Sequence, residues 1–416
     1  MRGFRQSALA LVLFIRFAGS AAAEGPGQGP PSMGQVATRS GAPNYHTTAF
    51  RFYNARSMHV ARDDIASLRI GLPNWYVAAA DTAVASHKHD GTESALGPSA
   101  ATVGCSVEYP IGVIDGLCRW KGSPVGAIAP GETGFSDAVV LARPIPSGAV
   151  FAVRQTYANP DGLPFHSNNL QATPGDGMEF SATPLPDKVG TVAPIKQAVS
   201  NEAVAFPAAI IAMTRQPSVC IAGDSRASGI LTGSNPAGDS GELAMTVGAK
   251  MAYINLAVSS DLALRAAANY RNRLALTAYC SRIISEYGAN DILNGRTAGQ
   301  TLAAIKVFVA ILPATKPIWE ATLAPLTTST DRWATTGNQA LVSSASNATR
   351  IAVNDAIRAS QIPGVKGVID IADVVESARN SGVWKGGWSA DGLHENYAGA
   401  VAIQASGVVN GALRGR

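Results

Sequence analysis

The pattern of hydrophobic and polar positions differs between the two halves of the chain. Before about residue 214, short apolar runs alternate with turn residues, at 67–72, 102–109, 137–142, 149–157 and 208–213. Short strands between frequent Gly and Pro turns, without a convincing amphipathic helix, are typical of a β-sandwich. We therefore expect a β-sandwich-like domain over residues 46–215.

After residue 217, strand-like runs alternate with helical ones. The pattern predicts strands at 218–222, 251–258, 318–323 and 367–371, a long Ala-rich helix at 262–286, and helices around 307–311 and 398–410. Strands alternating with helices at this spacing favour a doubly wound parallel α/β sheet, here over residues 216–416. Ligands bind such sheets beyond the carboxyl ends of the strands.

The first residues have the pattern of a secretory signal. Arg2 and Arg5 precede an apolar run over 8–15, and small residues at 21–23 offer a cleavage site. The run is shorter than the roughly 20 residues that cross a bilayer. We expect residues 1–23 to be removed and the protein to be secreted or periplasmic without stable membrane insertion, a retained anchor being the alternative. The Gly/Pro-rich residues 24–45 predict a flexible leader.

Composition narrows the function further. The chain has 416 residues, of which 46% are hydrophobic and 15% charged, enough for two or three packed domains. Its formal net charge of +4 falls to about +1 without the three arginines of residues 1–23, which gives no electrostatic case for nucleic acid. The sequence leaves the oligomeric state open.

Four cysteines favour two disulfides in an oxidising compartment. We prefer Cys105–Cys118 and Cys220–Cys280, with buried free thiols as the alternative for the second pair. No C-x-x-C spacing suggests zinc, and His87 and His89 fit a solvated loop better than a metal site. No metal or cofactor is therefore expected.

The candidate chemistry begins at the strand ending in Gly223-Asp224-Ser225. A serine at the following helix start exposes its hydroxyl at the sheet edge, beside backbone N–H groups that can stabilise negative charge in acyl transfer. A serine hydroxyl needs a neighbouring base. His394 is the only histidine of the α/β half, and Asp391, three residues earlier, can orient its ring.

Other residues around these segments could contribute. The Asn290 side chain could donate to an oxyanion, or it could cap the helix that follows. Arg226 could line the site, although a solvated surface position is the commoner case for an arginine. Trp384 and Trp388 precede Asp391 and could wall the pocket.

Together these segments resemble the SGNH hydrolase superfamily, also called GDSL esterases and lipases. The matching motifs are G-D-S-x-x-x-G at 223–229, G-x-N-D at 288–291 and D-x-x-H at 391–394, within about residues 218–416. The resemblance implies a three-layer α/β/α fold and metal-free ester hydrolysis through an acyl-enzyme. It makes Ser225 the nucleophile, His394 the base and Asp391 its orienting acid.

One block departs from this family pattern. In the segment 255–261, Ser260 stands where the family usually has the oxyanion glycine. The resemblance implies an oxyanion hole made by the backbone N–H groups of Ser225 and Ser260 and the side chain of Asn290. Glycine tolerates positive φ and serine usually does not, so a weakened oxyanion hole is one expectation here.

The function expected from the sequence is that of a secreted serine esterase. Its partner would be a small-molecule or polysaccharide ester, with O-acetylated carbohydrate as an example suggested by the attached β domain. A lipase or arylesterase and an acyltransferase are alternatives on the same triad. A carbohydrate-binding protein with a degenerate hydrolase domain is the alternative from another class.

Overall fold

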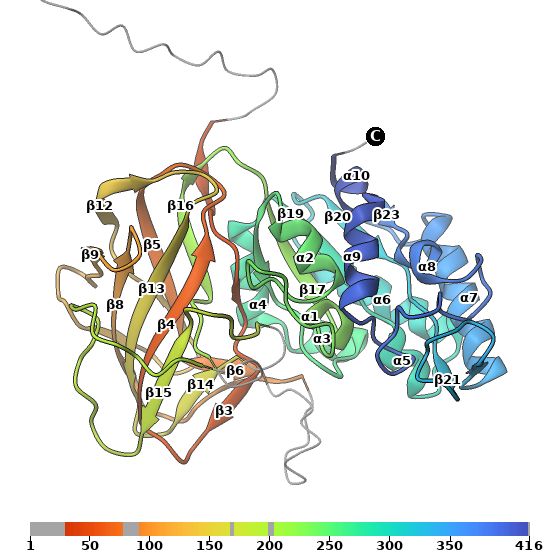
Figure 1. Ribbon diagram of the computed structural model, residues 1–416, viewed down its shortest axis with the longest axis horizontal. Helices are drawn as coiled ribbons and strands as arrows, with labels where there is room; N and C mark the ends of the chain where they lie inside the picture. Colours follow the sequence, from red (N-terminus) through yellow and green to blue (C-terminus); the bar gives the residue numbers. More distant parts are fainter. Residues whose placement is uncertain (1–29, 78–90, 167–169, 199–203, 415–416) are drawn as a thin grey trace, which may run out of the picture.

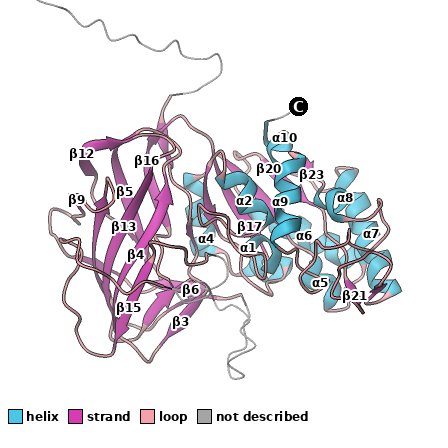
Figure 2. Ribbon diagram, in the orientation of Figure 1, coloured by secondary structure: helices cyan, strands magenta, loops and turns pink. Residues whose placement is uncertain are grey.

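The computed structural model describes residues 30–77, 91–166, 170–198 and 204–414. Two units lie side by side, one built of strands and the other of strands and helices (Figures 1 and 2). Within the described residues, no helix precedes Ser225. The predicted signal segment 1–23 lies outside the described residues.

Two antiparallel sheets form the first unit, the β unit. The first sheet holds β1 (Ser32–Gln35), β16 (Ala209–Thr214), β5 (Ile65–Pro73) and β11 (Thr133–Phe135) in that order, with β12 (Val139–Ile145) also on β5. The second holds β10 (Gly126–Ile128), β8 (Ala101–Glu108), β13 (Val150–Ala158), β4 (Phe52–Val60) and β15 (Gly177–Ser181), with β9 (Ile114–Leu117) on β8. Both sheets contribute to one core, in which Ile70 and Leu72 join Val103 and Tyr157.

The expected flexible leader over 24–45 is wrong for its described part. β1 pairs with β16, and β2 (Ser40–Gly41) joins the sheet of the second unit beside β18. β3 (Tyr45–Thr47) pairs with β14 (Leu163–Phe165). The glycine content has a packing reason here, because a Cβ on Gly41 would lie 2.5 Å from the carbonyl oxygen of Asn255.

A parallel sheet forms the centre of the second unit, the α/β unit. Its strand order is β2, β18 (Ala252–Asn255), β17 (Ser218–Gly223), β19 (Arg282–Glu286), β20 (Ile318–Ala321) and β23 (Val365–Ile369), and every neighbouring pair is parallel. Successive residues alternate between the two faces, so Val219 and Ile221 enter one core while Cys220 and Ala222 enter the other. Both faces are buried, which explains the continuous apolar runs in the sequence.

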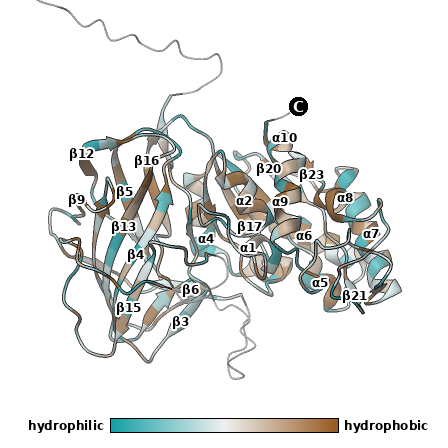
Figure 3. Ribbon diagram, viewed as in Figure 1, coloured by the Kyte–Doolittle hydropathy of each residue, from teal (hydrophilic) through white to brown (hydrophobic). Residues whose placement is uncertain are grey.

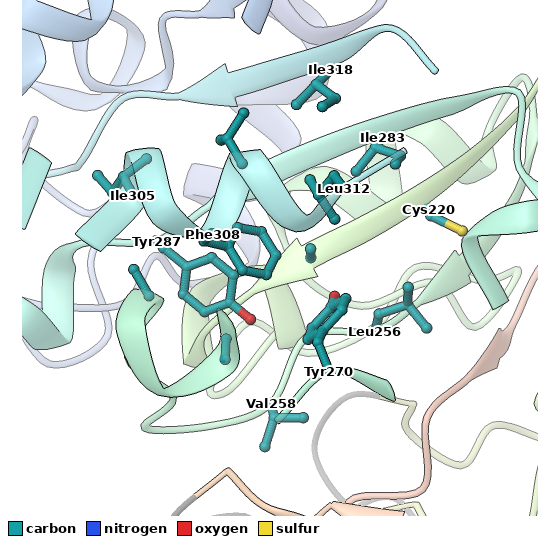
Figure 4. Close-up of a cluster of buried hydrophobic side chains, with 14 of the residues drawn as sticks. Cys220, Leu256, Val258, Tyr270, Ile283, Tyr287, Ile305, Phe308, Leu312 and Ile318 are labelled. Carbon is teal, nitrogen blue, oxygen red and sulfur yellow. The ribbon is translucent and has the colours of Figure 1, made fainter. Parts of the chain in front are cut away.

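Helices cover both faces of this sheet. One core includes residues of α3 (Ala263–Ala268), α4 (Arg271–Leu276), α6 (Ala298–Ile311) and α7 (Ser344–Arg358). The other includes residues of α2 (Glu242–Gly248), α8 (Ile371–Val375), α9 (Tyr397–Ser406) and α10 (Val408–Arg414). Figure 4 shows Phe308 of α6 beside Tyr287, and Leu312, the residue after α6, near Ile283 of the sheet.

The remaining elements are short. They are α1 (Ser225–Ser228), α5 (Ala289–Leu293), η1 (Thr277–Tyr279), and the hairpin pairs β6 (Trp75–Val77) with β7 (Glu93–Ala95) and β21 (Thr327–Ser329) with β22 (Gln339–Leu341). α1 and α5 follow β17 and β19 directly and carry the predicted nucleophile and oxyanion side chain.

The predicted long helix over 262–286 is wrong. The segment instead contains α3, α4, η1 and the central strand β19. The β-branched pair Ile283 and Ile284 lies in a strand buried on both faces, where an apolar run cannot be told from a buried helix by its periodicity. The predicted closing helix is likewise two helices, because Gly407 ends α9 with φ of 72°.

The two units share a hydrophobic core. Trp75 and Ile211 of the β unit belong to the same buried cluster as Cys220 and Ile254 of the parallel sheet. Strands β16 and β17, which adjoin this boundary in the sequence, are largely brown in the hydropathy colouring of Figure 3. The β unit is therefore packed firmly against the α/β unit.

All four cysteines are paired as the sequence analysis prefers. Cys105–Cys118 joins β8 to the end of β9, with Cα atoms 5.1 Å apart. Cys220–Cys280 joins β17 to the residue after η1, with Cα atoms 5.6 Å apart. The second disulfide therefore ties the strand that leads to Ser225 to the segment that leads into β19.

Candidate active site

Ser225 lies at the turn between β17 and α1, where the sequence predicts it. Asp224 caps the helix, and its carboxylate accepts a hydrogen bond from the backbone N–H of Arg226 at 3.2 Å. A Cβ on Gly223 would lie 2.9 Å from the carbonyl oxygen of Glu286, so this tight turn favours glycine. The first N–H groups of a helix have no intrahelical acceptor, which leaves that of Ser225 suited to bind an oxyanion.

A continuous hydrogen-bond chain joins the three predicted catalytic residues. Ser225 Oγ lies 2.8 Å from His394 Nε2, and His394 Nδ1 lies 2.8 Å from Asp391 Oδ2. Ser225 and His394 are 6% and 7% exposed, so the bonds are largely shielded from water while the serine stays within reach of the surface. With the Nδ1 proton directed at Asp391, Nε2 is free to accept the serine proton.

The loop that carries His394 is held by its own hydrogen bonds. Asp391 Oδ1 accepts from the backbone N–H groups of Leu393 and His394 at 2.9 and 2.8 Å. Burial raises the pKa of Asp391, but the hydrogen bond and charge of His394 and these two N–H groups outweigh it, so the net shift is downward. Asp391 therefore stays ionised beside the imidazole.

The predicted oxyanion residues come from the strands flanking β17. Ser260 follows β18, and Asn290 follows β19 as the second residue of α5. The N-cap of α5 is Gly288, so Asn290 is not the helix cap that was its alternative role. Its side-chain Nδ2 donates to the carbonyl oxygen of Asp261 at 3.2 Å, which holds the amide against the loop containing Ser260.

Ser260 takes the conformation that the family pattern assigns to glycine. Its φ is +62°, in the left-handed region that serine rarely enters. The backbone therefore keeps the conformation suited to glycine although the residue is serine, and this costs about 1–2 kcal/mol of conformational energy. The surrounding contacts must hold this residue in place.

Arg226 is not a surface arginine, contrary to the sequence-based expectation. It is 1% exposed and sits among three buried glutamates. Its Nη2 donates to both carboxylate oxygens of Glu242 at 2.8 and 2.6 Å, and it lies 3.5 Å from Glu286 Oε1. Its Nε is 3.8 Å from Glu395 Oε2. This arginine–glutamate cluster lies directly behind the nucleophile.

Three of the acids around Arg226 hold protons more strongly than usual. Burial, together with the nearby Glu242, raises the pKa of Glu286 well above its ordinary value. Burial and Glu242 also raise the pKa of Glu395 to about 8, with Arg226 opposing them. Burial raises the pKa of Asp224 to about 6. Protonation of Glu286 and Glu395 keeps the cluster near neutral, since one guanidinium cannot balance three carboxylates.

The sequence reasoning missed these glutamates. Glu286 lies two residues before the G-x-N-D segment, and Glu395 directly follows D-x-x-H. The signal was available as an acid two residues after the β-branched pair Ile283 and Ile284. Acids are almost never fully buried unless they are paired, so an acid in a strand-like segment indicates a buried charge partner.

Aromatic residues border the histidine loop, although not all as expected. Trp384 is fully buried, and its Nε1 donates to the carbonyl oxygen of Gly392 at 3.1 Å, so it supports the loop instead of walling a pocket. Trp388 is half-buried, with Lys385 Nζ 5.0 Å from its ring. Trp333, which the sequence analysis missed, accepts a backbone hydrogen bond from Gly387 at 2.6 Å and lies against Gly392.

The described residues contain no group of three or more His, Cys, Asp or Glu placed to hold a metal. The His87 and His89 pair lies outside the part of the chain that the structure describes. Within that part, no helix is long and apolar enough to span a bilayer.

Comparison with known proteins gives matches only among solved structures. The sequence matches no family model and no curated protein. A member of the lipolytic protein G-D-S-L family from Veillonella parvula is 17% identical, with 46% of this chain and 96% of that chain covered and a TM-score of 0.36. An acetyl xylan esterase is 14% identical, with coverage of 46% and 99% and a TM-score of 0.35. An acetyl-xylooligosaccharide esterase from Geobacillus Stearmophilus, as a mutant, is 14% identical, with coverage of 46% and 91% and a TM-score of 0.33.

Proposed function

We propose that this chain is a serine ester hydrolase that cleaves short-acyl carboxylic esters through an acyl-enzyme. The observation that carries the proposal is the hydrogen-bond chain from Ser225 through His394 to Asp391, with both bonds at 2.8 Å. A nucleophile, a base and an acid that orients the base are the parts required for acyl transfer.

The chemistry follows from this order of groups. Ser225 Oγ attacks the ester carbonyl carbon while its proton passes to His394 Nε2. The backbone N–H groups of Ser225 and Ser260 and the Asn290 amide stabilise the oxyanion. The alcohol leaves with the proton held by His394, and the acyl group remains on Ser225. Water then attacks the acyl carbon, gives its proton to His394, and the acid is released as Ser225 regains a proton.

We further propose acetylated carbohydrate as the substrate class and export as the destination of the protein. The half-buried aromatic rings of Trp333 and Trp388 beside the histidine loop support the first point, because such rings stack well on sugar faces. The arginines, apolar run and small residues within 1–23 support the second.

Hydrolysis of p-nitrophenyl acetate by the wild type and by Ser225→Ala tests the proposal. We expect the variant to lose nearly all activity, and a fluorophosphonate probe to label the wild type but not the variant. Ser281→Ala is the matched control, since that hydroxyl donates to Ser218 at the opposite end of β17, at 3.1 Å. Equal rates for the wild type and Ser225→Ala would remove the triad assignment.

A substrate panel then decides the ester class. p-Nitrophenyl esters of increasing chain length distinguish a short-acyl esterase from a lipase, and release of acetate from acetylated xylan tests the carbohydrate proposal. Transfer of the acetyl group to an added sugar instead of water would identify an acyltransferase. Binding of the polysaccharide without turnover of any ester would favour the alternative that the chain is a carbohydrate-binding protein with a degenerate hydrolase domain.

A further inference from the structure

Arg273 connects the β unit to the loop that follows β18. The side chain is fully buried, and its guanidinium donates to four acceptors, one of which is the carbonyl oxygen of Asn269 at 3.1 Å. Nε reaches Glu93 Oε1 at 3.0 Å, and Nη1 reaches Asp261 Oδ2 at 3.0 Å. Nη2 donates to the carbonyl oxygen of Gly91 at 3.1 Å. Glu93 and Gly91 belong to the β unit, whereas Asp261 directly follows Ser260.

Asp261 in turn contacts both proposed oxyanion segments. Its carbonyl oxygen accepts from Asn290 Nδ2 at 3.2 Å, and its Oδ2 accepts from the Tyr287 hydroxyl at 3.3 Å. Because Asp261 directly follows Ser260, holding Asp261 in place also holds the peptide bond between the two residues. Any displacement of Asp261 therefore moves the loop backbone and the Asn290 amide together.

The β-unit side of this contact is built tightly. Glu93 accepts from the backbone N–H groups of Asn272 and Arg273 at the start of α4, so it also fixes the helix that carries the arginine. A Cβ on Gly91 would lie 2.5 Å from Asp261 Oδ1, which shows how closely this segment covers the aspartate. Strand β7, which begins at Glu93, pairs with β6, and β6 contributes Trp75 to the core shared by the two units.

We propose that Arg273 is a positioning residue for the oxyanion hole, and that the β unit, through Glu93 and Gly91, supplies its second anchor. The inference rests on the proposed function. Its physical basis is that Ser260 occupies a left-handed conformation that serine disfavours, which persists only where the surroundings hold it. Oxyanion donors must lie within about 2.7–3.1 Å of the developing charge, so a small shift of this loop weakens catalysis.

The test separates kcat from KM for p-nitrophenyl acetate in four variants. Arg273→Met removes the bridge, Arg273→Lys keeps the charge, and Glu93→Gln removes the charge of the β-unit anchor together with one of its two acceptor oxygens. Glu132→Gln is the matched control, because Glu132 and Arg271 form an inter-unit ion pair at 2.5 Å that is exposed and does not reach Asp261.

We expect kcat to fall about 10- to 100-fold in Arg273→Met with KM changed less than about threefold, because a misplaced donor costs transition-state stabilisation. Arg273→Lys should recover part of that loss, and Glu93→Gln should lower kcat by roughly three- to tenfold. Glu132→Gln should match the wild type. Should Arg273→Met fail to fold, Glu93→Gln decides the question.

The outcomes distinguish this inference from the proposed function. A wild type that hydrolyses esters and loses activity in Ser225→Ala, but whose kcat is unchanged in Glu93→Gln and Arg273→Lys despite a lower melting temperature, would overturn the positioning role alone. A wild type that turns over no ester, and whose Ser225 is not labelled by the fluorophosphonate, would overturn the proposed function itself.

Discussion

The carboxyl group of Glu395 lies 3.8 Å from the guanidinium of Arg226, so the residue after the proposed base contacts the residue after the proposed nucleophile. Glu286, at the end of the strand that leads to Asn290, lies 3.5 Å from the same guanidinium. One buried arginine therefore adjoins the three segments that carry the serine, the histidine and the asparagine. The balance between the charge of Arg226 and those of the surrounding glutamates should therefore affect both the stability of the protein and its catalytic activity.

Glu395 should make the protein less stable as the pH rises. The folded-state pKa of about 8 exceeds the ordinary 4.5, so between these values the folded protein holds a proton that the unfolded chain has released. The stabilisation is complete below pH 4.5 and is lost as the pH rises to about 8, by up to about 1.4 kcal/mol per pH unit. Glu286 adds to the same trend.

Glu395→Gln should flatten this dependence, because an amide imitates the protonated carboxyl at every pH. The measurement is the free energy of unfolding in urea at pH 5, 6, 7 and 8 for the wild type and the variant. Glu179→Gln serves as a control, since Glu179 is a partly exposed partner of Lys188. Burial raises the pKa of Glu179, but hydrogen bonds from Lys188 and Asn54 outweigh it, so the net shift is downward. Parallel curves for the wild type and Glu395→Gln would contradict the prediction.

Arg226→Met should destabilise the protein strongly. It leaves the buried carboxylate of Glu242 without its cation, and breaking a buried ion pair from one side costs roughly 3–5 kcal/mol. We also expect kcat to fall, because the turns carrying Ser225 and His394 lose their common contact. Urea unfolding and esterase assays at a temperature where the variant is folded measure the two effects.

Arg350→Met gives the comparison for that variant. Arg350 is also fully buried and pairs with Glu376 at 2.6 Å, but it lies on α7 and its hydrogen bonds go to Asn347, Leu323 and Glu376. A similar loss of stability without a loss of kcat would show that the activity effect in Arg226→Met is specific to its position. Equal kcat losses in the two variants would argue against the role given to Arg226.

The sequence predicts those parts of the fold that depend on short-range patterns. The strand before Ser225, the helix around 307–311 and both disulfides follow from short-range apolar patterns and cysteine placement. The segment 262–286 was misassigned because Ala-rich helix and buried strand share an apolar composition, and only the sheet neighbours of Ile283 decide between them. Residues 32–41 were misassigned because their pairing partners lie more than 170 positions away.

The site shows a similar division. Ser225, Asp391 and His394 could be identified because each lies in a short motif, and the asparagine followed from its place between them. Glu286 could have been noticed as an acid in a strand-like segment, but its meeting with Glu242 and Glu395 could not, because the three are distant in sequence and come together only in the folded α/β unit. The contact of Glu93 with Arg273 depends likewise on how the two units pack.

Ser260→Gly should leave the enzyme active. The proposed donor is the backbone N–H, which glycine retains, and glycine adopts the observed φ of +62° without strain. The relief of strain opposes the larger entropy of glycine in the unfolded chain, so we expect the free energy of unfolding to change by less than about 1 kcal/mol. In contrast, Ser260→Val places a β-branched side chain at this φ and should lower kcat at least about tenfold. Equal kcat values for the glycine and valine variants would contradict the oxyanion role of this loop.

Asp391→Asn should lower kcat by roughly 10⁴ while KM changes little, because an amide no longer fixes the imidazole with its proton on Nδ1 and no longer stabilises the imidazolium that forms. The loop should keep its shape, since the amide oxygen can still accept from the backbone N–H groups of Leu393 and His394. Asp373→Asn is the matched control, an exposed carboxylate paired with Arg379 at 2.7 Å and remote from the triad. Steady-state kinetics with p-nitrophenyl acetate measure the effect, and circular dichroism verifies that both variants fold. A kcat in Asp391→Asn within tenfold of the wild type would mean that His394 is oriented by some other group.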